Sequence, residues 1–233
     1  MAGYLHEFLF GIYPYICGSV FLVASLARFE RAQYSWRSGS SQLLRRRQLR
    51  WGSNLFHAGI LFLFFGHFFG MLTPHVVYER FIDPGSKQML AVVSGGIAGA
   101  VCLVGLSLLL HRRLFDDRIR ATSSAMDIAI LAILWLQLVL GLATLPSSIA
   151  HADGSVMLRL SEWAQRIVTF RAGAAELVAG LDWPYLVHMA LGMTIFLIFP
   201  FSRLVHIWSA PIGYVFRNPQ IVRRRGAQAR PKA

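Results

Sequence analysis

Residues 55–70 read LFHAGILFLFFGHFFG, and they place His57 and His67 inside a stretch that is otherwise apolar and aromatic. A solvated loop does not have this composition. Ionisable side chains inside a bilayer are costly, and those that occur there usually have a function. The stretch therefore predicts a membrane-spanning helix whose two histidines have a chemical role.

The composition of the whole chain is that of a membrane protein. Hydrophobic residues make up 55% of the 233 residues and charged residues only 15%, which leaves too little polar surface for a soluble domain. A span needs roughly 20 apolar residues to cross about 30 Å of hydrocarbon. We expect an all-α integral membrane bundle, a single domain over 1–233, with five transmembrane helices at about 5–27, 53–73, 89–110, 126–146 and 184–208. The first stretch lacks a basic flank and a cleavage site, so we expect it to be retained and not removed as a signal peptide.

The arginines predict how this bundle is oriented. Segment 28–50 holds seven arginines, segment 111–120 holds four, and the tail 209–233 holds five arginines and one lysine. The loops 74–88 and 147–183 are poorer in basic residues, so the positive-inside rule puts the N-terminus outside and the basic tail in the cytoplasm. The net charge of +12 lies mostly on these inner segments. No nucleic-acid motif accompanies it, and we expect it to meet anionic lipid or an acidic partner protein.

Small residues in the third span predict a close helix contact. Gly95 and Gly99 are four residues apart, a spacing that lets two helices approach closely, although ordinary glycine in a membrane helix explains them equally well. Cys17 and Cys102 fall within spans and form no CxxC pair. We therefore expect no disulfide framework and no zinc or iron–sulfur site.

The outer loop contains one amphipathic segment, residues 155–170, which reads SVMLRLSEWAQRIVTF. A helix there would carry its apolar side chains on one side and its charged side chains on the other. It could lie in the membrane interface, or it could be a plain surface helix that covers the bundle. The apolar set is Leu160, Trp163 and Ile167, and the charged set is Arg159, Glu162 and Arg166.

Four of the eight histidines lie within spans: His57 and His67 in the second, and His188 and His206 in the fifth. Ten residues of helix turn about 80° short of three full turns, so His57 and His67 share one broad face. Eighteen residues make five full turns, which would put His188 and His206 in line. Because the two spans run in opposite directions, the four histidines form two pairs at two depths. The other four lie at span ends or in loops and are not expected to bind a cofactor: His6, His75, His111 and His151.

Paired imidazoles from facing helices can hold a haem iron from both sides. Phenylalanines around His67 supply aromatic walls, and Gly59, Gly66, Gly70 and Gly192 supply room for a flat macrocycle. The rise between the histidines is roughly 15 Å in the second span but roughly 27 Å in the fifth, so we expect a visible tilt or adjustment. The alternative is another metal, yet a two-histidine zinc site needs Cys, Asp or Glu ligands, of which these spans offer few.

The chain resembles the gamma subunit of respiratory nitrate reductase, a membrane cytochrome b, over about residues 8–225. The pieces that carry the resemblance are IYPYI, QYSWR, SNLFHAGILFLFFGHFFGMLTPH, RRLF with RAT, DGS, WAQRIVTF and HMALGMTIFLIFPFSRLVHIWSAP. The resemblance implies two haems b, the inner one bound by His57 and His206 and the outer one by His67 and His188. It further implies a multi-pass protein of the cell inner membrane, with an iron–sulfur beta subunit and a molybdenum-containing alpha subunit on the cytoplasmic side. The chain would then be the quinol-oxidising electron-transfer subunit, with menaquinol or ubiquinol as substrate and the nitrate chemistry on a partner.

Three charged residues are candidates for further contacts in such a protein. Lys87 matches the family's quinol-site lysine, although an interfacial lysine that snorkels to water is the plainer explanation. Arg203 and Arg112 are candidates for binding haem propionates, because a guanidinium offers a bidentate fork to a carboxylate; for Arg112, a lipid headgroup contact is equally plausible. For Asp127 and Gln137 of the fourth span, helix capping and interhelical bonding suffice.

Two other functions are compatible with the sequence. One is a cytochrome b anchor of a formate dehydrogenase, a hydrogenase or a sulfur-compound reductase, which shares bis-histidine haems but usually differs in span count and histidine placement. The other is a haem-free anchor or transporter. Many transporters contain inverted repeats, and none is visible in the sequence.

Overall fold

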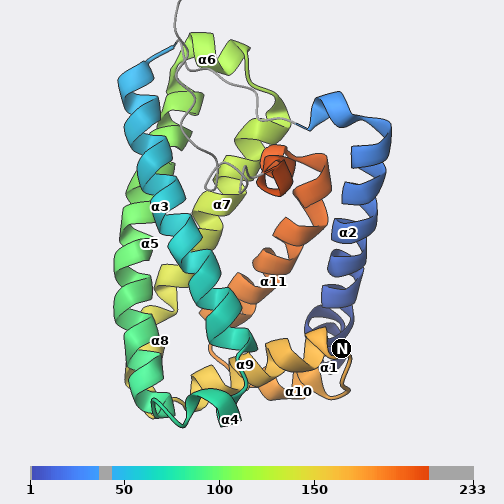
Figure 1. The fold of residues 1–233 in the computed structure, drawn as a ribbon, viewed down its shortest axis with the longest axis vertical. Coiled ribbons are helices and arrows are strands. Elements are labelled where there is room, and N and C mark those ends of the chain that lie inside the picture. Colours follow the sequence, from blue (N-terminus) through green and yellow to red (C-terminus); the bar gives the residue numbers. More distant parts are fainter. Residues whose placement is uncertain (1, 37–43, 210–233) are drawn as a thin grey trace, which may run out of the picture.

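The computed structural model describes residues 2–36 and 44–209, and within them every regular element is helical (Figure 1). The basic tail predicted for 209–233 lies outside the described residues except for its first residue. Five helices in the described part are long and apolar enough to cross a membrane, as predicted. Their bounds are Gly3–Arg31, Arg46–Leu72, Pro84–Phe115, Ala125–Ala150 and Trp183–Phe201.

The third and fourth spans begin at capping side chains. The first joins α1 (Ala2–Glu7), a π-helical turn η1 (Phe8–Ile12) and α2 (Tyr13–Arg31), and α3 (Arg46–Leu72) is the second. The third, α5 (Pro84–Phe115), starts at Asp83, whose carboxylate accepts a hydrogen bond from the backbone N–H of Ser86 at 2.9 Å. The fourth joins α7 (Ala125–Ala143) to α8 (Leu145–Ala150). Ser124 and Asp127 form a reciprocal capping box at its start, which confirms the capping role expected for Asp127.

The fifth span differs from the prediction of one helix over 184–208. The α-helix α11 (Trp183–Ile198) stops, and two short 3-10 segments follow, η3 (Phe199–Phe201) and η4 (Arg203–Ser209). Pro200 lies at the stop, and proline has no N–H to continue the helical ladder. His206 is therefore not on the same helix as His188, and the prediction that they stand in line five turns apart is wrong. The rise of roughly 27 Å calculated for an unbroken helix does not apply.

Gly59 and Gly105 bring α3 and α5 into close contact, and of the two glycines that the spacing indicated, Gly99 lies at a close contact, with α7, and Gly95 does not. A Cβ on Gly105 would lie 2.3 Å from the backbone nitrogen of Phe56, and one on Gly59 would lie 2.6 Å from Cβ of Cys102. By contrast, a Cβ on Gly95 would meet nothing within 4 Å, and one on Gly99 would meet Leu142 of α7. Gly59 thus serves helix packing and does not leave room for a macrocycle.

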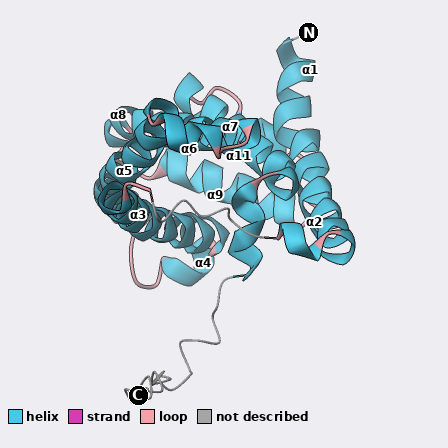
Figure 2. Ribbon diagram, turned by 90° about the horizontal axis from the view of Figure 1, so that it is seen from above, coloured by secondary structure: helices cyan, strands magenta, loops and turns pink. Residues whose placement is uncertain are grey.

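The spans pack as successive neighbours: α3 against α5, α5 against α7, α7 against α11, and α11 against α2. The helix α3 packs against α5 and α9 (Ser155–Val168), whereas α11 packs against α2 and α7, and α3 and α11 hardly touch. Viewed from above, α3 and α5 lie on one side and α2 on the other, with α7 and α11 between them (Figure 2). The two helices that carry the span histidines therefore face each other with few direct contacts between them.

The amphipathic segment 155–170 forms α9, which crosses one end of the bundle beside α10 (Ala174–Val178) (Figure 1). Its apolar side packs on protein: Trp163 is buried and donates a hydrogen bond from Nε1 to the carbonyl of Phe10 at 2.9 Å. On the charged side, Arg166 pairs with Glu162 at 2.6 Å. These contacts favour a helix that covers the bundle over one whose apolar face lies in lipid. The remaining short elements are η2 (Gln33–Ser35), α4 (His75–Tyr78) and α6 (Asp117–Ala121).

Candidate functional site

The four span histidines share one local arrangement, in which Nδ1 lies within hydrogen-bond distance of a backbone carbonyl oxygen. A carbonyl only accepts hydrogen bonds, so each Nδ1 carries the proton and each Nε2 has a lone pair that can accept a hydrogen bond or bind a metal. In His188 this Nε2 lies 3.4 Å from the amide Nε2 of Gln137, which is a hydrogen-bond donor. Such a carbonyl contact fixes the tautomer and the orientation of metal-binding histidines in many proteins. The contacts are His57 to Ser53 at 2.7 Å, His67 to Leu63 at 2.8 Å, His188 to Gln137 at 3.0 Å and His206 to Arg203 at 2.6 Å.

The structure brings one predicted pair together. The ring centroids of His67 and His188 lie 6.3 Å apart, with the ring planes inclined at 43°. A metal ion bonded to one nitrogen of each ring at about 2 Å fits within that separation, because the rest is the distance from each nitrogen to its ring centre. Within the described ranges, no three His, Cys, Asp or Glu side chains gather as a metal-binding group. A metal held between these two imidazoles would have to take its other ligands from elsewhere, as a porphyrin iron does.

The surroundings of His67 leave space for a large planar group. His67 is exposed on α3, and a Cβ on Gly66 or on Gly70 would meet nothing within 4 Å. Four phenylalanines beside it have exposed rings as well: Phe64, Phe65, Phe68 and Phe69. His57 is exposed on the same helix, in agreement with the shared face that the ten-residue spacing predicts. Of the glycines expected to supply room for a macrocycle, Gly66 and Gly70 adjoin open space, and their role beside a macrocycle stays a prediction.

His188 is held closely by the neighbouring helix α7. Besides the contact of its Nδ1, its carbonyl oxygen accepts a hydrogen bond from Nε2 of Gln137 at 3.0 Å, which confirms the interhelical bond expected for Gln137. A Cβ on Gly141 would lie 2.9 Å from Cε1 of the His188 ring. A Cβ on Gly192 would lie 3.1 Å from Nε2 of Gln137, so Gly192 accommodates that amide and not a macrocycle.

An arginine–aspartate cluster lies at the end of the bundle where the fifth span finishes. Arg203 approaches one carboxylate oxygen of Asp127 at 3.7 Å, and Arg113 approaches the other at 3.5 Å. Arg113 also donates to the hydroxyl of Ser123 at 2.9 Å. Sequence reasoning missed Arg113 because the adjacent arginine, Arg112, has the same character. Figure 1 shows this end of the coloured chain near the start of α7.

Arg112 is 3% exposed and donates to the carbonyl oxygen of Leu44 at 2.7 Å. Its side chain therefore fastens the end of α5 to the chain just before α3. This burial does not favour the lipid-headgroup contact that the sequence left open.

Lys87 is half-buried and has two partners on neighbouring segments. Its Nζ donates to the carbonyl oxygen of Gly70 at 3.0 Å and lies 3.3 Å from the ring centre of Tyr78. Gly70 follows His67 by about one helical turn, so this bond joins Lys87 of α5 to the end of α3 that bears His67. Burial, with a smaller contribution from the charge of Glu79, raises the pKa of Tyr78. The neutral phenol ring offers the cation an apolar, electron-rich face, and no pattern in the sequence indicates this contact.

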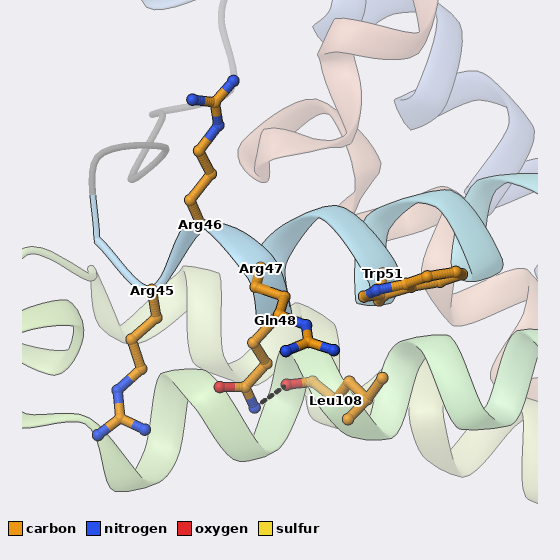
Figure 3. Close-up of a pocket in the computed structure, with 6 residues that line it drawn as sticks. All are labelled: Arg45, Arg46, Arg47, Gln48, Trp51 and Leu108. Carbon is orange, nitrogen blue, oxygen red and sulfur yellow. Dashed lines mark hydrogen bonds between the residues drawn. The ribbon is translucent and has the colours of Figure 1, made fainter.

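A hollow of about 600 Å³ lies elsewhere, at the start of α3 (Figure 3). Figure 3 shows Arg45 and Arg46 pointing away from each other, so the basic side chains do not converge on one point. Arg45 pairs instead with Asp116. The other lining residues are Arg47, Gln48, Trp51 and Leu108.

Comparison with known proteins gives a consistent result over nearly the full length. Residues 6–225 match the family model described as nitrate reductase gamma subunit. The chain is 52% identical over 222 residues to the respiratory nitrate reductase 1 gamma chain of Escherichia coli strain K12, covering 95% of this chain and 99% of that protein. It is 35% identical over 220 residues to the nitrate reductase gamma chain of Bacillus subtilis strain 168, covering 94% and 98%.

Proposed function

The chain belongs to the nitrate reductase gamma subunit family, and from this premise we propose that it is the dihaem cytochrome b anchor of a respiratory nitrate reductase. It oxidises quinol near the outer membrane face and delivers the electrons inward. The nitrate chemistry belongs to a molybdenum-containing alpha subunit, reached through an iron–sulfur beta subunit, both on the cytoplasmic side. The chain lies in the cell inner membrane with its N-terminus outside.

In this proposal the histidines hold two haems b at two depths. His67 and His188 are the axial ligands of the outer haem, and His57 and His206 are those of the inner one. When bound, the haems supply one-electron carriers whose potentials the protein tunes through the axial ligands and their hydrogen bonds. The observation that carries the proposal is the approach of the His67 and His188 rings, 6.3 Å between centroids, with both Nδ1 atoms turned to carbonyl groups.

Lys87 is the proposed contact for the quinol, which is menaquinol or ubiquinol. Support comes from its ammonium, which donates to the carbonyl of Gly70, three residues after His67 on α3. A cation there donates a hydrogen bond to a quinol oxygen and favours loss of the hydroxyl proton, which leaves on the outer side. Tyr78 and the Gly70 carbonyl hold the ammonium in place before the quinol arrives.

Arg203 and Arg112 are the proposed partners of haem propionates. Arg203 is the better placed of the two because it lies three residues before His206, and a propionate would share it with the Asp127 carboxylate 3.7 Å away. Arg112 is already engaged with the Leu44 carbonyl, and a propionate contact would have to form beside that bond. A guanidinium suits this role because its donors are fixed in a plane.

The test is a reduced-minus-oxidised spectrum with haem quantitation on the purified chain and its His→Ala variants. We expect two haems per wild-type chain, one per chain in either His67→Ala or His57→Ala, and two in the control His151→Ala. His151 makes the same kind of Nδ1 contact, to Ser147 at 3.0 Å, but lies in the outer loop. If the spectrum of the wild-type chain lacks the alpha absorption band of reduced haem, the chain is a haem-free anchor and the proposal is wrong.

A further inference from the structure

The break in the fifth span interrupts the backbone hydrogen-bond ladder. The helix α11 ends at Ile198, and Ser202, between the two 3-10 segments, adopts an extended conformation. Carbonyl groups beside such an interruption lose the partners that a continuous α-helix would give them. Irregular backbone within a membrane bundle is tolerated only where other groups supply the missing hydrogen bonds. Donors for this break are therefore expected from another part of the chain.

Arg28, at the end of α2, supplies them. Its Nη1 donates to the carbonyl of Pro200 at 2.6 Å and to that of Ser202 at 2.9 Å. Its Nη2 donates to the carbonyl of Ser35 at 2.9 Å, and its Nε donates to the Ser35 hydroxyl at 3.1 Å. One guanidinium thus ties the first span, the turn after it and the broken last span together. A planar fork can do this, whereas a lysine ammonium has neither the reach nor the fixed geometry for all four bonds.

Arg28 holds the carbonyl of Ser202, and the next carbonyl along the chain, that of Arg203, orients the ring of His206. The Ser202 hydroxyl accepts a hydrogen bond from the N–H of Leu204 at 3.1 Å and so starts η4. Within that segment the carbonyl of Arg203 accepts the Nδ1 proton of His206 at 2.6 Å. Val205, next to His206, is fully buried, which fixes the segment from the other side. The direction of the His206 ring therefore depends on where the Ser202–Arg203 peptide is held.

We propose that Arg28 is a positioning residue for His206, and that it selectively maintains the inner haem site. This inference rests on the proposed function, because it requires His206 to be an axial ligand. His188 precedes the break, on the continuous helix α11, and takes its hydrogen bonds from α7. The outer site should for that reason be independent of Arg28.

The experiment compares Arg28→Gln and Arg28→Lys with Arg31→Gln in the assembled membrane complex. Arg31 is an exposed arginine on the same helix, which makes it a matched control for charge. Haem content, low-spin electron paramagnetic resonance signals and redox titration report the two haems separately. We expect Arg28→Gln to lose about tenfold or more in inner-haem affinity, the usual size of an effect on the groups that orient a ligand, with the outer haem unchanged. Arg28→Lys should insert normally, because it keeps the charge, and should still show an altered inner-haem signal and potential.

The outcomes separate this inference from the function on which it rests. A wild-type complex without two haems would contradict the proposed function itself. A wild type with two haems and Arg28 variants with an unchanged inner signal and potential would overturn only the role of Arg28. Equal loss of both haems, together with a lower unfolding temperature, would also overturn it, since Arg28 would then support the fold as a whole.

Discussion

At the scale of single residues, the outer site depends on a small number of side chains from different helices. The ring centroids of His67 and His188 lie 6.3 Å apart. Lys87 donates to the carbonyl of Gly70, one turn after His67, and lies over the ring of Tyr78. Each of these contacts joins two separate helical segments. A small change at any of them should alter the outer site without unfolding the bundle.

Replacing Lys87 with alanine should slow quinol oxidation. A hydrogen bond from a charged donor is worth about 1.5–3 kcal/mol, so kcat/KM should fall about 10- to 100-fold while the haem spectrum stays the same. Steady-state oxidation of a quinol analogue by the membrane complex measures this, with Arg80→Ala as the control because Arg80 is exposed in the same loop. Unchanged turnover in Lys87→Ala would remove the lysine from the quinol site.

Replacing Gly141 with alanine should displace the His188 ring. The added Cβ would lie 2.9 Å from Cε1 of that ring, although alanine is otherwise favourable in a helix. We expect about tenfold or greater loss of outer-haem affinity, visible as loss of that haem from the difference spectrum, with the inner haem retained. Gly18→Ala is the control, because a Cβ there meets nothing within 4 Å. If Gly141→Ala retains the outer haem in full, then binding of that haem does not require the observed position of the His188 ring.

At the scale of elements, the pairing of α3 with α5 determines where both histidines of α3 face. The two helices pack through Gly105, Gly59 and Gly52, and the face of α3 that bears His57 and His67 is left exposed. In a membrane, an apolar helix face can meet either lipid or another helix, so hydrophobicity alone does not decide which face of α3 packs on α5. The small residues decide it, because they allow close approach of the two helices on one side only.

Gly105→Ala should weaken this pairing. The new Cβ would lie 2.3 Å from a backbone nitrogen of α3, which cannot move aside as a flexible side chain can. Overpacking of this kind costs about 1–3 kcal/mol, and thermal unfolding of the detergent-solubilised chain should register it as a lower midpoint. On the same helix Gly95→Ala meets open space and should unfold as the wild type does. Equal midpoints for the two variants would contradict the tight contact.

The junction between α5 and α6 should respond to pH. A backbone hydrogen bond from Ile119, aided by Arg45, lowers the pKa of Asp116 below its ordinary value. A lowered pKa in the folded state stabilises the protein above the unfolded-state pKa, and that stability is lost as the pH falls through the folded-state value. Asp116→Asn should therefore unfold more easily than the wild type at neutral pH, and the difference should shrink as the pH falls below about 4. A difference that persists undiminished at acid pH would exclude the carboxylate as its source.

At the scale of the whole molecule, the proposed direction of electron flow depends on the orientation of the bundle in the membrane. The positive-inside rule predicts the loop 147–183 outside and the segment 111–120 inside. Cysteines introduced by Arg171→Cys and Arg118→Cys test this, since both positions are exposed and the native Cys17 and Cys102 are fully buried. A membrane-impermeant maleimide should label Arg171→Cys in intact spheroplasts and Arg118→Cys only after permeabilisation. The reverse labelling pattern would mean that the bundle has the opposite orientation, and the proposed direction of electron flow would then be wrong.

The class of protein, the five spans, the shared face of His57 and His67, and the family could all be predicted from the order of the amino acids. These features are local: they depend on hydrophobic length, on helical spacing and on short motifs, all of which can be read along one segment. The capping role of Asp127 was likewise visible, because a capping box needs only four consecutive residues. The amphipathic pattern of 155–170 predicted the helix but not whether lipid or protein covers its apolar side.

Which distant groups meet became known only from the folded bundle. Pro200 was visible in the sequence, yet a proline alone does not say whether a span bends or stops. In the folded chain the α-helix stops at Ile198, and Arg28, 172 positions from Pro200, donates to the carbonyl groups at the break. In the same way, the choice of Gly105 over Gly95 and the seating of His188 on Gly141 depend on which helices become neighbours. Helical periodicity identifies the face that a side chain occupies, but the partner of that face is set by the packing of the bundle.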